Sequence, residues 1–201
     1  MRALILAGGA GSRLGPGEKP LTLIAGRPMI AYVVEAFRTA GCEPVVAVSP
    51  RTPMTANWCR ALDVPVCRTG GGGFVEDMVQ AVRQLEESGP VFVSVSDIPC
   101  IRPGVIAAIR EAYTAAGRDA LSTWIPERLV MSGREGMPYR LEVNGVAACP
   151  AGINILRGDR VDEPQEEYAL LLDEPCLAIN VNMRADRARA ESFLKDSASR
   201  A

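Results

Sequence analysis

Residues 3–21 read ALILAGGAGSRLGPGEKPL, an apolar run followed by a glycine-rich segment and then by Lys19-Pro20-Leu21. The run over residues 3–7 is continuously apolar rather than alternating, which is typical of a central strand that is covered on both faces. Glycines between the carboxyl end of a strand and the next helix let backbone N–H groups approach and hold phosphates. This stretch therefore predicts a phosphate-binding loop at the ligand-binding edge of a parallel sheet.

Outward from this stretch, short apolar runs alternate with amphipathic segments, which predicts a parallel sheet flanked by helices. We expect strands at residues 3–7, 45–48, 64–67, 90–96 and 120–125, and helices at 28–40, 54–62, 74–85 and 105–116. The pattern then changes, because Asn144-Gly145 between strand-like residues indicates a type I′ hairpin within residues 139–148. An acidic loop at 159–167, a strand at 177–181 and a helix at 185–195 complete the expected order.

The fold class predicted from this order is α/β. We expect a Rossmann-like three-layer α/β/α sandwich whose mostly parallel sheet carries an antiparallel hairpin excursion. With no linker in the sequence, residues 1–201 are expected to form a single domain.

Composition excludes several classes of function. The chain has no histidine, which removes Ser-His-Asp and Cys-His catalysis as well as HExxH zinc sites. Its 22 basic and 24 acidic side chains give a net charge of −2, so no bulk positive field attracts nucleic acid or an anionic membrane. Six cysteines without a C-x-x-C pair indicate buried thiols rather than a zinc ribbon. No apolar run suits a signal peptide or a membrane span, and we expect a cytoplasmic protein.

Three kinds of nucleotide site compete for the glycine-rich loop. A P-loop needs Gly-Lys-Ser/Thr, and here Lys19 follows Glu18. A dinucleotide fold needs G-x-G-x-x-G and an acid after the second strand, and neither is present. The nucleotidyltransferase signature, a glycine loop followed by an arginine and then Lys-Pro-Leu, fits Arg13 and Lys19, which can neutralise triphosphate oxygens. The plain alternative is a flexible turn with two solvated cations, and the position after the first strand favours the phosphate site.

Two later segments carry candidate metal ligands. Asp97 ends the apolar run at 90–96, so its carboxylate is expected at the same sheet edge as the glycine loop. Mg²⁺ is held by few protein carboxylates and completes its shell with phosphate oxygens and water, so one aspartate suffices, although Asp97 could instead cap the following turn. Asn182 either caps the last helix or adds a ligand to the metal.

These segments resemble a known family. The opening LAGGAGSRLG with EKPL and SVSDIP is similar to nucleotidyltransferases of the sugar-nucleotide and molybdenum-cofactor guanylyltransferase type. Further segments resemble, in the same order and over nearly the whole chain, the archaeal-type GTP:adenosylcobinamide-phosphate guanylyltransferases: VSPRTPMT, GGGFVEDM, STWIPE, PAGINIL and NVNMRADRARAE. One departure is that this family often has Gly-Lys-Gly-Tyr where this chain has residues 71–74, so a basic contact there is absent or is supplied by Arg68.

The resemblance implies GMP transfer from GTP to adenosylcobinamide phosphate in cobalamin biosynthesis, with Mg²⁺ as cofactor. It implies catalytic roles for Arg13, Lys19 and Asp97, metal binding by Asp97 with Asn182, and acceptor contacts by Gly152 and Asn154. The implied GTP-binding residues are Leu6, Ala7, Gly8, Gly9, Gly11, Ser12, Arg13, Lys19, Thr69, Gly70 and Gly73. Asp173 either faces the site or is a surface acid, and a homodimer is compatible with this scheme. The alternatives are a related transferase acting on molybdopterin or a sugar phosphate, and a non-catalytic GTP-binding module.

Overall fold

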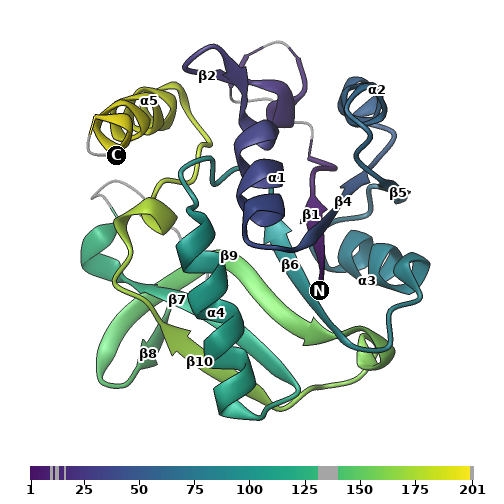
Figure 1. Ribbon diagram of the computed structural model, residues 1–201, viewed down its shortest axis with the longest axis vertical. Coiled ribbons are helices and arrows are strands. Elements are labelled where there is room, and N and C mark those ends of the chain that lie inside the picture. The colour runs from purple at the N-terminus through teal and green to yellow at the C-terminus, as the bar shows by residue number, and fades with distance from the viewer. Residues whose placement is uncertain (10, 12–13, 16, 131–139, 200–201) are drawn as a thin grey trace.

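A mixed eight-stranded sheet forms the centre of the computed structural model, which describes residues 1–9, 11, 14–15, 17–130 and 140–199 (Figure 1). Its strand order is β10-β7-β9-β6-β1-β4-β5, and β8 pairs with β9. The strands are β1 (Arg2–Leu6), β4 (Glu43–Val48), β5 (Val66–Arg68), β6 (Pro90–Val95), β7 (Ala120–Pro126), β8 (Leu141–Val143), β9 (Val146–Arg157) and β10 (Glu167–Leu171). Strands β5, β4, β1 and β6 are parallel, and β9 runs antiparallel between β6 and β7. A small hairpin of β2 (Leu23–Ile24) and β3 (Arg27–Pro28) lies apart from this sheet.

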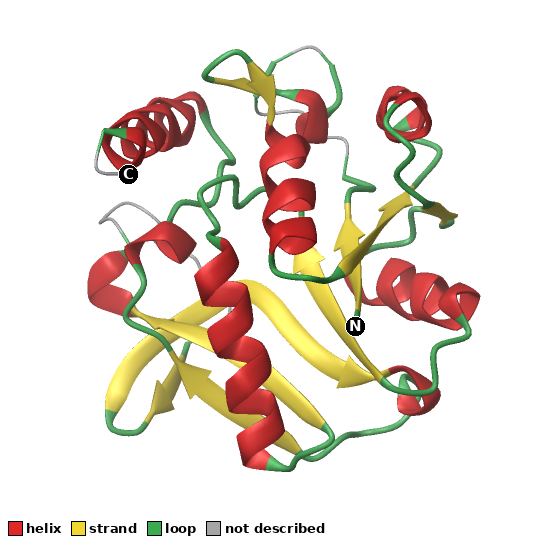
Figure 2. Cartoon of the chain, in the orientation of Figure 1, coloured by secondary structure: helices red, strands yellow, loops and turns green. Residues whose placement is uncertain are grey.

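Helices cover both faces of the sheet, which gives three layers (Figure 2). They are α1 (Met29–Thr39), α2 (Pro53–Ala61), α3 (Phe74–Leu85), α4 (Pro103–Ala116) and α5 (Arg184–Ala198). Side chains alternate along β1, so Ala3 and Ile5 pack with α1 and α4 while Leu4 packs with α3 on the other face. The α/β class and the mostly parallel sheet are thus confirmed.

The hairpin signal is also confirmed. Asn144 and Gly145 have φ angles of 52° and 78° between β8 and β9, as a type I′ turn requires. The second strand is longer than expected, because β9 continues through residue 157 and inserts into the sheet.

The expected strand at residues 177–181 is wrong. A short 3-10 helix, η4 (Pro175–Ala178), stands there, and its apolar side chains are buried without pairing to a neighbouring strand. The residues of this run are apolar because they are buried in the core, and we interpreted the run as a strand. The actual last strand is β10, which was not predicted and which pairs in parallel with β7.

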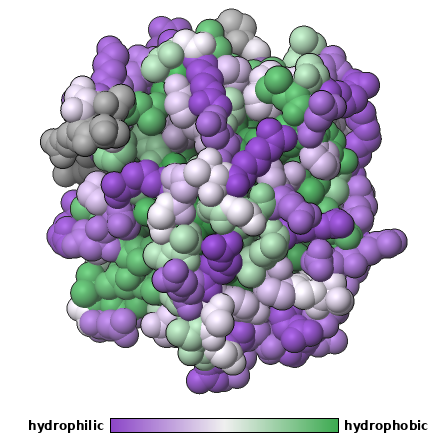
Figure 3. Space-filling model, in the orientation of Figure 1, coloured by the Kyte–Doolittle hydropathy of each residue, from purple (hydrophilic) through white to green (hydrophobic). Residues whose placement is uncertain are grey.

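The surface is mostly hydrophilic in the view of Figure 3, with apolar side chains showing at the lower left, over the β8–β10 end of the sheet, and at the upper right. Within the described ranges, no helix is both long enough and apolar enough to cross a membrane. All six cysteines are buried free thiols.

Candidate active site

Strand register brings three loops to one edge of the sheet. Leu6 at the end of β1 lies opposite Ala47 of β4 and Val95 of β6. The segments that follow these strands therefore start at the same level, and Asp97 comes two residues after Val95. This placement is the one expected for ligand sites in open parallel sheets.

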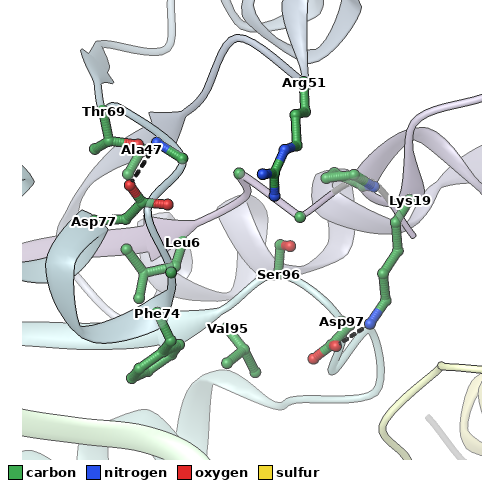
Figure 4. Close-up of a pocket in the computed structure, with 15 residues that line it drawn as sticks. Leu6, Lys19, Ala47, Arg51, Thr69, Phe74, Asp77, Val95, Ser96 and Asp97 are labelled. Atoms are coloured by element: carbon green, nitrogen blue, oxygen red, sulfur yellow. Dashed lines mark hydrogen bonds and ion pairs between the residues drawn. The ribbon is translucent and has the colours of Figure 1, made fainter. Parts of the chain in front are cut away.

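A cavity of about 230 Å³ opens at this edge (Figure 4). It lies between the glycine loop after β1, the loop after β4, the amino end of α3 and the end of β6. Seven of the residues predicted for the site line it: Leu6, Gly8, Gly9, Lys19, Thr69, Gly73 and Asp97. The structure thus brings both halves of the predicted nucleotide site, the first loop and the loop at residues 69–73, around one space.

Lys19 and Asp97 form an ion pair at one end of this pocket. The side chains are 15% and 14% exposed, so the pair is largely shielded from solvent. Lys19 Nζ also donates a 2.6 Å hydrogen bond to Oδ1 of Asn182, and Asn180 Nδ2 donates a 3.0 Å hydrogen bond to Oδ1 of Asp97. Asn182 in turn donates to the side-chain oxygen of Asn180. The four side chains make one connected polar network.

The network speaks against a capping role for two residues and leaves their metal binding a prediction. Asp97 directs its carboxylate to Lys19 and Asn180 rather than to a following turn. The side chain of Asn182 does not cap α5, because the N-cap residue is Met183 and Oδ1 of Asn182 accepts from Lys19. The carboxylate of Asp186 accepts the backbone N–H groups of Asn182 and Met183 at 2.9 Å each. The amide group of Asn182 is left to face Lys19.

Lys19 is fixed from its own side of the pocket. The carboxylate of Glu18 accepts hydrogen bonds of 2.6 Å from the backbone N–H groups of Met54 and Thr55 and from the Thr55 hydroxyl, so it binds the amino end of α2. Gly11 packs directly on Lys19, because a Cβ at Gly11 would lie 2.2 Å from Lys19 Cβ, and its φ of +62° also favours glycine. The loop therefore needs glycine at this point to let the lysine reach Asp97.

The far wall is the loop that enters α3. Thr69 is buried, and its hydroxyl donates to the Val48 carbonyl at 3.2 Å. The backbone N–H of Gly70 donates to Gln80, and that of Gly71 donates to Oδ1 of Asp77, each at 2.8 Å. Two side chains of α3 thus hold the loop that precedes the helix.

Several pocket residues were not predicted as site residues. Arg51 extends from the loop after β4 toward the middle of the pocket in Figure 4, and Asp77 and Phe74 line it from α3. Asn180 belongs to the site because its side chain donates a hydrogen bond to Asp97. The sequence signal that could have identified Arg51 was its position, because it follows a strand that ends at the ligand-binding edge of the sheet.

Other predicted residues lie elsewhere. Ser12 and Arg13 fall outside the described residues. Ala7 and Gly70 are neighbours in the chain of residues that line the cavity, and Gly11 packs on Lys19, but none of the three lines the cavity itself.

Three further residues were predicted near the acceptor or the site: Gly152 and Asn154, which lie on β9, and Asp173. Gly152, with a φ of +77°, packs against Val95, where a Cβ would lie 2.7 Å from Val95 Cγ2. Asn154 accepts a 3.3 Å hydrogen bond from the backbone of Thr123 within the sheet. Asp173 pairs with Arg128 at the surface.

The donor set suits a magnesium ion better than zinc. In the part of the chain that is described, no three or more His, Cys, Asp or Glu side chains cluster to hold a metal. Mg²⁺ does not need such a cluster, because it takes one or two carboxylates and fills its shell with phosphate oxygens and water. Oxygens of Asp97 and Asn182 converge on the cationic group of Lys19, so this point already attracts positive charge.

Comparisons with known proteins agree with this geometry. The chain is 31% identical to the adenosylcobinamide-phosphate guanylyltransferase of Methanocaldococcus jannaschii, with 97% of this chain and 98% of that protein covered. It is also 31% identical to the 2-C-methyl-D-erythritol 4-phosphate cytidylyltransferase of Deinococcus radiodurans, with 95% and 82% covered. A solved nucleotidyl transferase from Methanothermobacter thermautotroptrophicus has the same fold, with a TM-score of 0.68 at 19% identity and with 97% and 98% of the two chains covered. The model of the MobA-like NTP transferase domain matches residues 3–197, and the chain belongs to this family of nucleotidyltransferases.

Proposed function

We propose that this protein transfers GMP from GTP to adenosylcobinamide phosphate, giving adenosylcobinamide-GDP and pyrophosphate. The observation that carries nucleotidyl transfer is the meeting of a glycine loop, Lys19 and Asp97 at one edge of the sheet. The choice of guanine and of the corrinoid acceptor is supported by the named relative from Methanocaldococcus jannaschii and by the order of shared segments.

The reaction needs cations more than a base. An oxygen of the acceptor phosphate attacks the α-phosphorus of GTP, a new P–O bond forms, and the bond to the β-phosphate oxygen breaks to release pyrophosphate. A phosphate monoester has its second pKa near ~6 and is already mostly dianionic at neutral pH. Catalysis without histidine is therefore a matter of aligning two anions and neutralising them.

This chain offers the groups for that task. The carboxylate of Glu18 fixes the adjoining backbone to α2, and Lys19 pairs with Asp97 at the pocket. Arg51 reaches toward the same space. We assign Arg13 to the same phosphate site from the sequence signature. Asp97 and Asn182 would hold Mg²⁺, which when bound supplies positive charge to the triphosphate.

The acceptor is proposed to approach over β9. Val95 lines the pocket and touches Gly152, where any side chain would push into the pocket wall. Glycine at this position therefore lets β9 pack closely behind Val95, which lines the pocket. Asn154 and Asp173 are not supported as acceptor contacts by their hydrogen bonds, since both are used within the protein.

A substrate panel scored by pyrophosphate release tests the proposal. GTP, ATP and CTP are each combined with adenosylcobinamide phosphate, molybdopterin or a sugar 1-phosphate. Release with GTP and adenosylcobinamide phosphate alone supports the proposal, and release with another acceptor assigns the chain to a related transferase. GTP binding without release in any combination would mean a non-catalytic nucleotide-binding module.

Location and assembly are further parts of the proposal. We place the enzyme in the cytoplasm, where its six buried thiols stay reduced. A homodimer is tested by the mass of the protein in solution.

A further inference from the structure

Asp77 places a carboxylate in the nucleotide pocket on the side away from Lys19 and Asp97 (Figure 4). It lies in the first turns of α3, next to Thr69 and Leu6 in the same view. The pocket therefore holds one carboxylate that is paired with Lys19 and, on the other side, the carboxylate of Asp77, which forms no ion pair with any described residue.

The two carboxylate oxygens of Asp77 have different surroundings. Oδ1 accepts the 2.8 Å hydrogen bond from the backbone N–H of Gly71. Oδ2 is directed toward the glycine loop, 3.3 Å from the position that a Cβ would take on Gly8. Among the residues that the structure describes, none donates a hydrogen bond to Oδ2 and no Lys or Arg forms an ion pair with Asp77.

An unused carboxylate oxygen constrains how a nucleotide lies in this pocket. An ionised carboxylate only accepts hydrogen bonds, and it repels phosphate. The triphosphate must therefore lie toward Lys19 and Arg51, and the part of the ligand beside Asp77 must present donors. In a nucleoside triphosphate these donors belong to the base or to the ribose.

We propose that Asp77 selects guanine by accepting hydrogen bonds from its Watson–Crick edge. This inference rests on the proposed use of GTP. Guanine presents N1–H and the 2-amino group side by side, and both are donors. Adenine presents an unprotonated N1 and no 2-amino group at the same edge, so its lone pair would face the carboxylate. A charge-assisted hydrogen bond in a partly buried pocket discriminates strongly between these bases.

Asp77→Asn separates this role from a structural one. The amide oxygen can still accept from the N–H of Gly71, so the loop keeps its support, while an NH₂ donor replaces Oδ2. Glu76→Gln is the matched control, because it removes the same charge from the same turn of α3 at an exposed residue that does not line the pocket. Dissociation constants of GTP, ATP, ITP, N1-methyl-GTP and 2′-deoxy-GTP are measured by calorimetry for the three proteins.

We expect Asp77→Asn to weaken GTP binding by about tenfold or more and to leave ATP binding unchanged or tighter. Glu76→Gln should keep the wild-type ratio of GTP to ATP affinity. Wild-type protein should bind ITP, which lacks the 2-amino group, or N1-methyl-GTP, which lacks N1–H, more weakly than GTP. These two probes need no variant, so the inference is tested even if Asp77→Asn does not fold.

Three results would overturn the inference. An unchanged GTP-to-ATP ratio in folded Asp77→Asn would leave Asp77 with its loop contact only. Equal losses for GTP and ATP in that variant, with weak binding of 2′-deoxy-GTP by the wild type, would assign the carboxylate to the ribose. If the wild-type protein bound both ITP and N1-methyl-GTP as tightly as GTP, the Watson–Crick edge of guanine would not be recognised. Equal affinity of the wild-type protein for GTP and ATP would overturn both this inference and the proposed guanylyl transfer. The three results above overturn only the role of Asp77, so the two failures can be distinguished.

Discussion

Asp97→Asn tests the centre of the proposed site most directly. The substitution keeps the size of the side chain and one oxygen that can accept a hydrogen bond, and it removes the negative charge beside Lys19. Because the Asp97 side chain is only 14% exposed, water screens this charge little. Loss of one preorganised electrostatic group typically lowers kcat by about 10²–10³, and we expect a loss of that order.

The same substitution should also lower the free energy of unfolding, and the ion pair sets the scale of this loss. Removing one partner from a buried ion pair costs about 3–5 kcal/mol when the other charge is left unpaired. Lys19 is not left alone here, because Asn182 Oδ1 still accepts its 2.6 Å hydrogen bond and some water reaches the pair. We therefore expect the free energy of unfolding without ligands to fall by about 1–3 kcal/mol, a discounted value on the same scale.

Two measurements check these values. Pyrophosphate release at saturating GTP and acceptor is followed over a Mg²⁺ titration, and denaturant unfolding is followed without ligands. Asp162→Asn is the control, because it removes the same charge from an exposed pair with Arg83 and should change stability by less than about 0.5 kcal/mol. A folded Asp97→Asn protein with the wild-type rate and Mg²⁺ dependence would refute both the metal role and the position of the active site.

The remaining predictions concern the support of the site and the thiols. Gly11→Ala should raise the GTP dissociation constant by about tenfold, since a Cβ there collides with Lys19, and unchanged calorimetric affinity would contradict this contact. Glu18→Gln should lower the free energy of unfolding by about 1 kcal/mol in denaturant titrations, because the amino end of α2 loses its carboxylate cap. Burial raises the pKa of Cys59 to about 11 and that of Cys100 to about 12. Unfolded thiols ionise first, so stability should be full below about pH 8.5 and fall as pH rises toward these values, and unfolding titrations with equal stability at pH 7 and pH 10 would contradict this.

Much of the fold could be predicted because its signals are local. The continuous apolar run of β1 and the Asn144-Gly145 turn each specify their own structure within a few residues. The segment at 167–181 lacks such a signal. β10 becomes a strand by pairing with β7, whereas η4 buries its apolar side chains in the core without pairing to a strand. Which of two apolar runs joins a sheet depends on the space beside the sheet edge, and the run itself does not contain that information.

The site shows the same limit at the level of single side chains. Asp97 was predicted as a site residue because it ends an apolar run whose carboxyl end was expected at the same sheet edge as the glycine loop. Asp77 was not predicted as a site residue, since the positive amino end of α3 is a sufficient local reason for an acidic residue in its first turn. The structure shows that the same carboxylate also faces the pocket, because Gly71 and Gly8 bring the two loops against it. A residue that satisfies a local rule gives no sign of a second role, so the residues most easily missed in a site are those whose presence is already explained by the helix or turn that carries them.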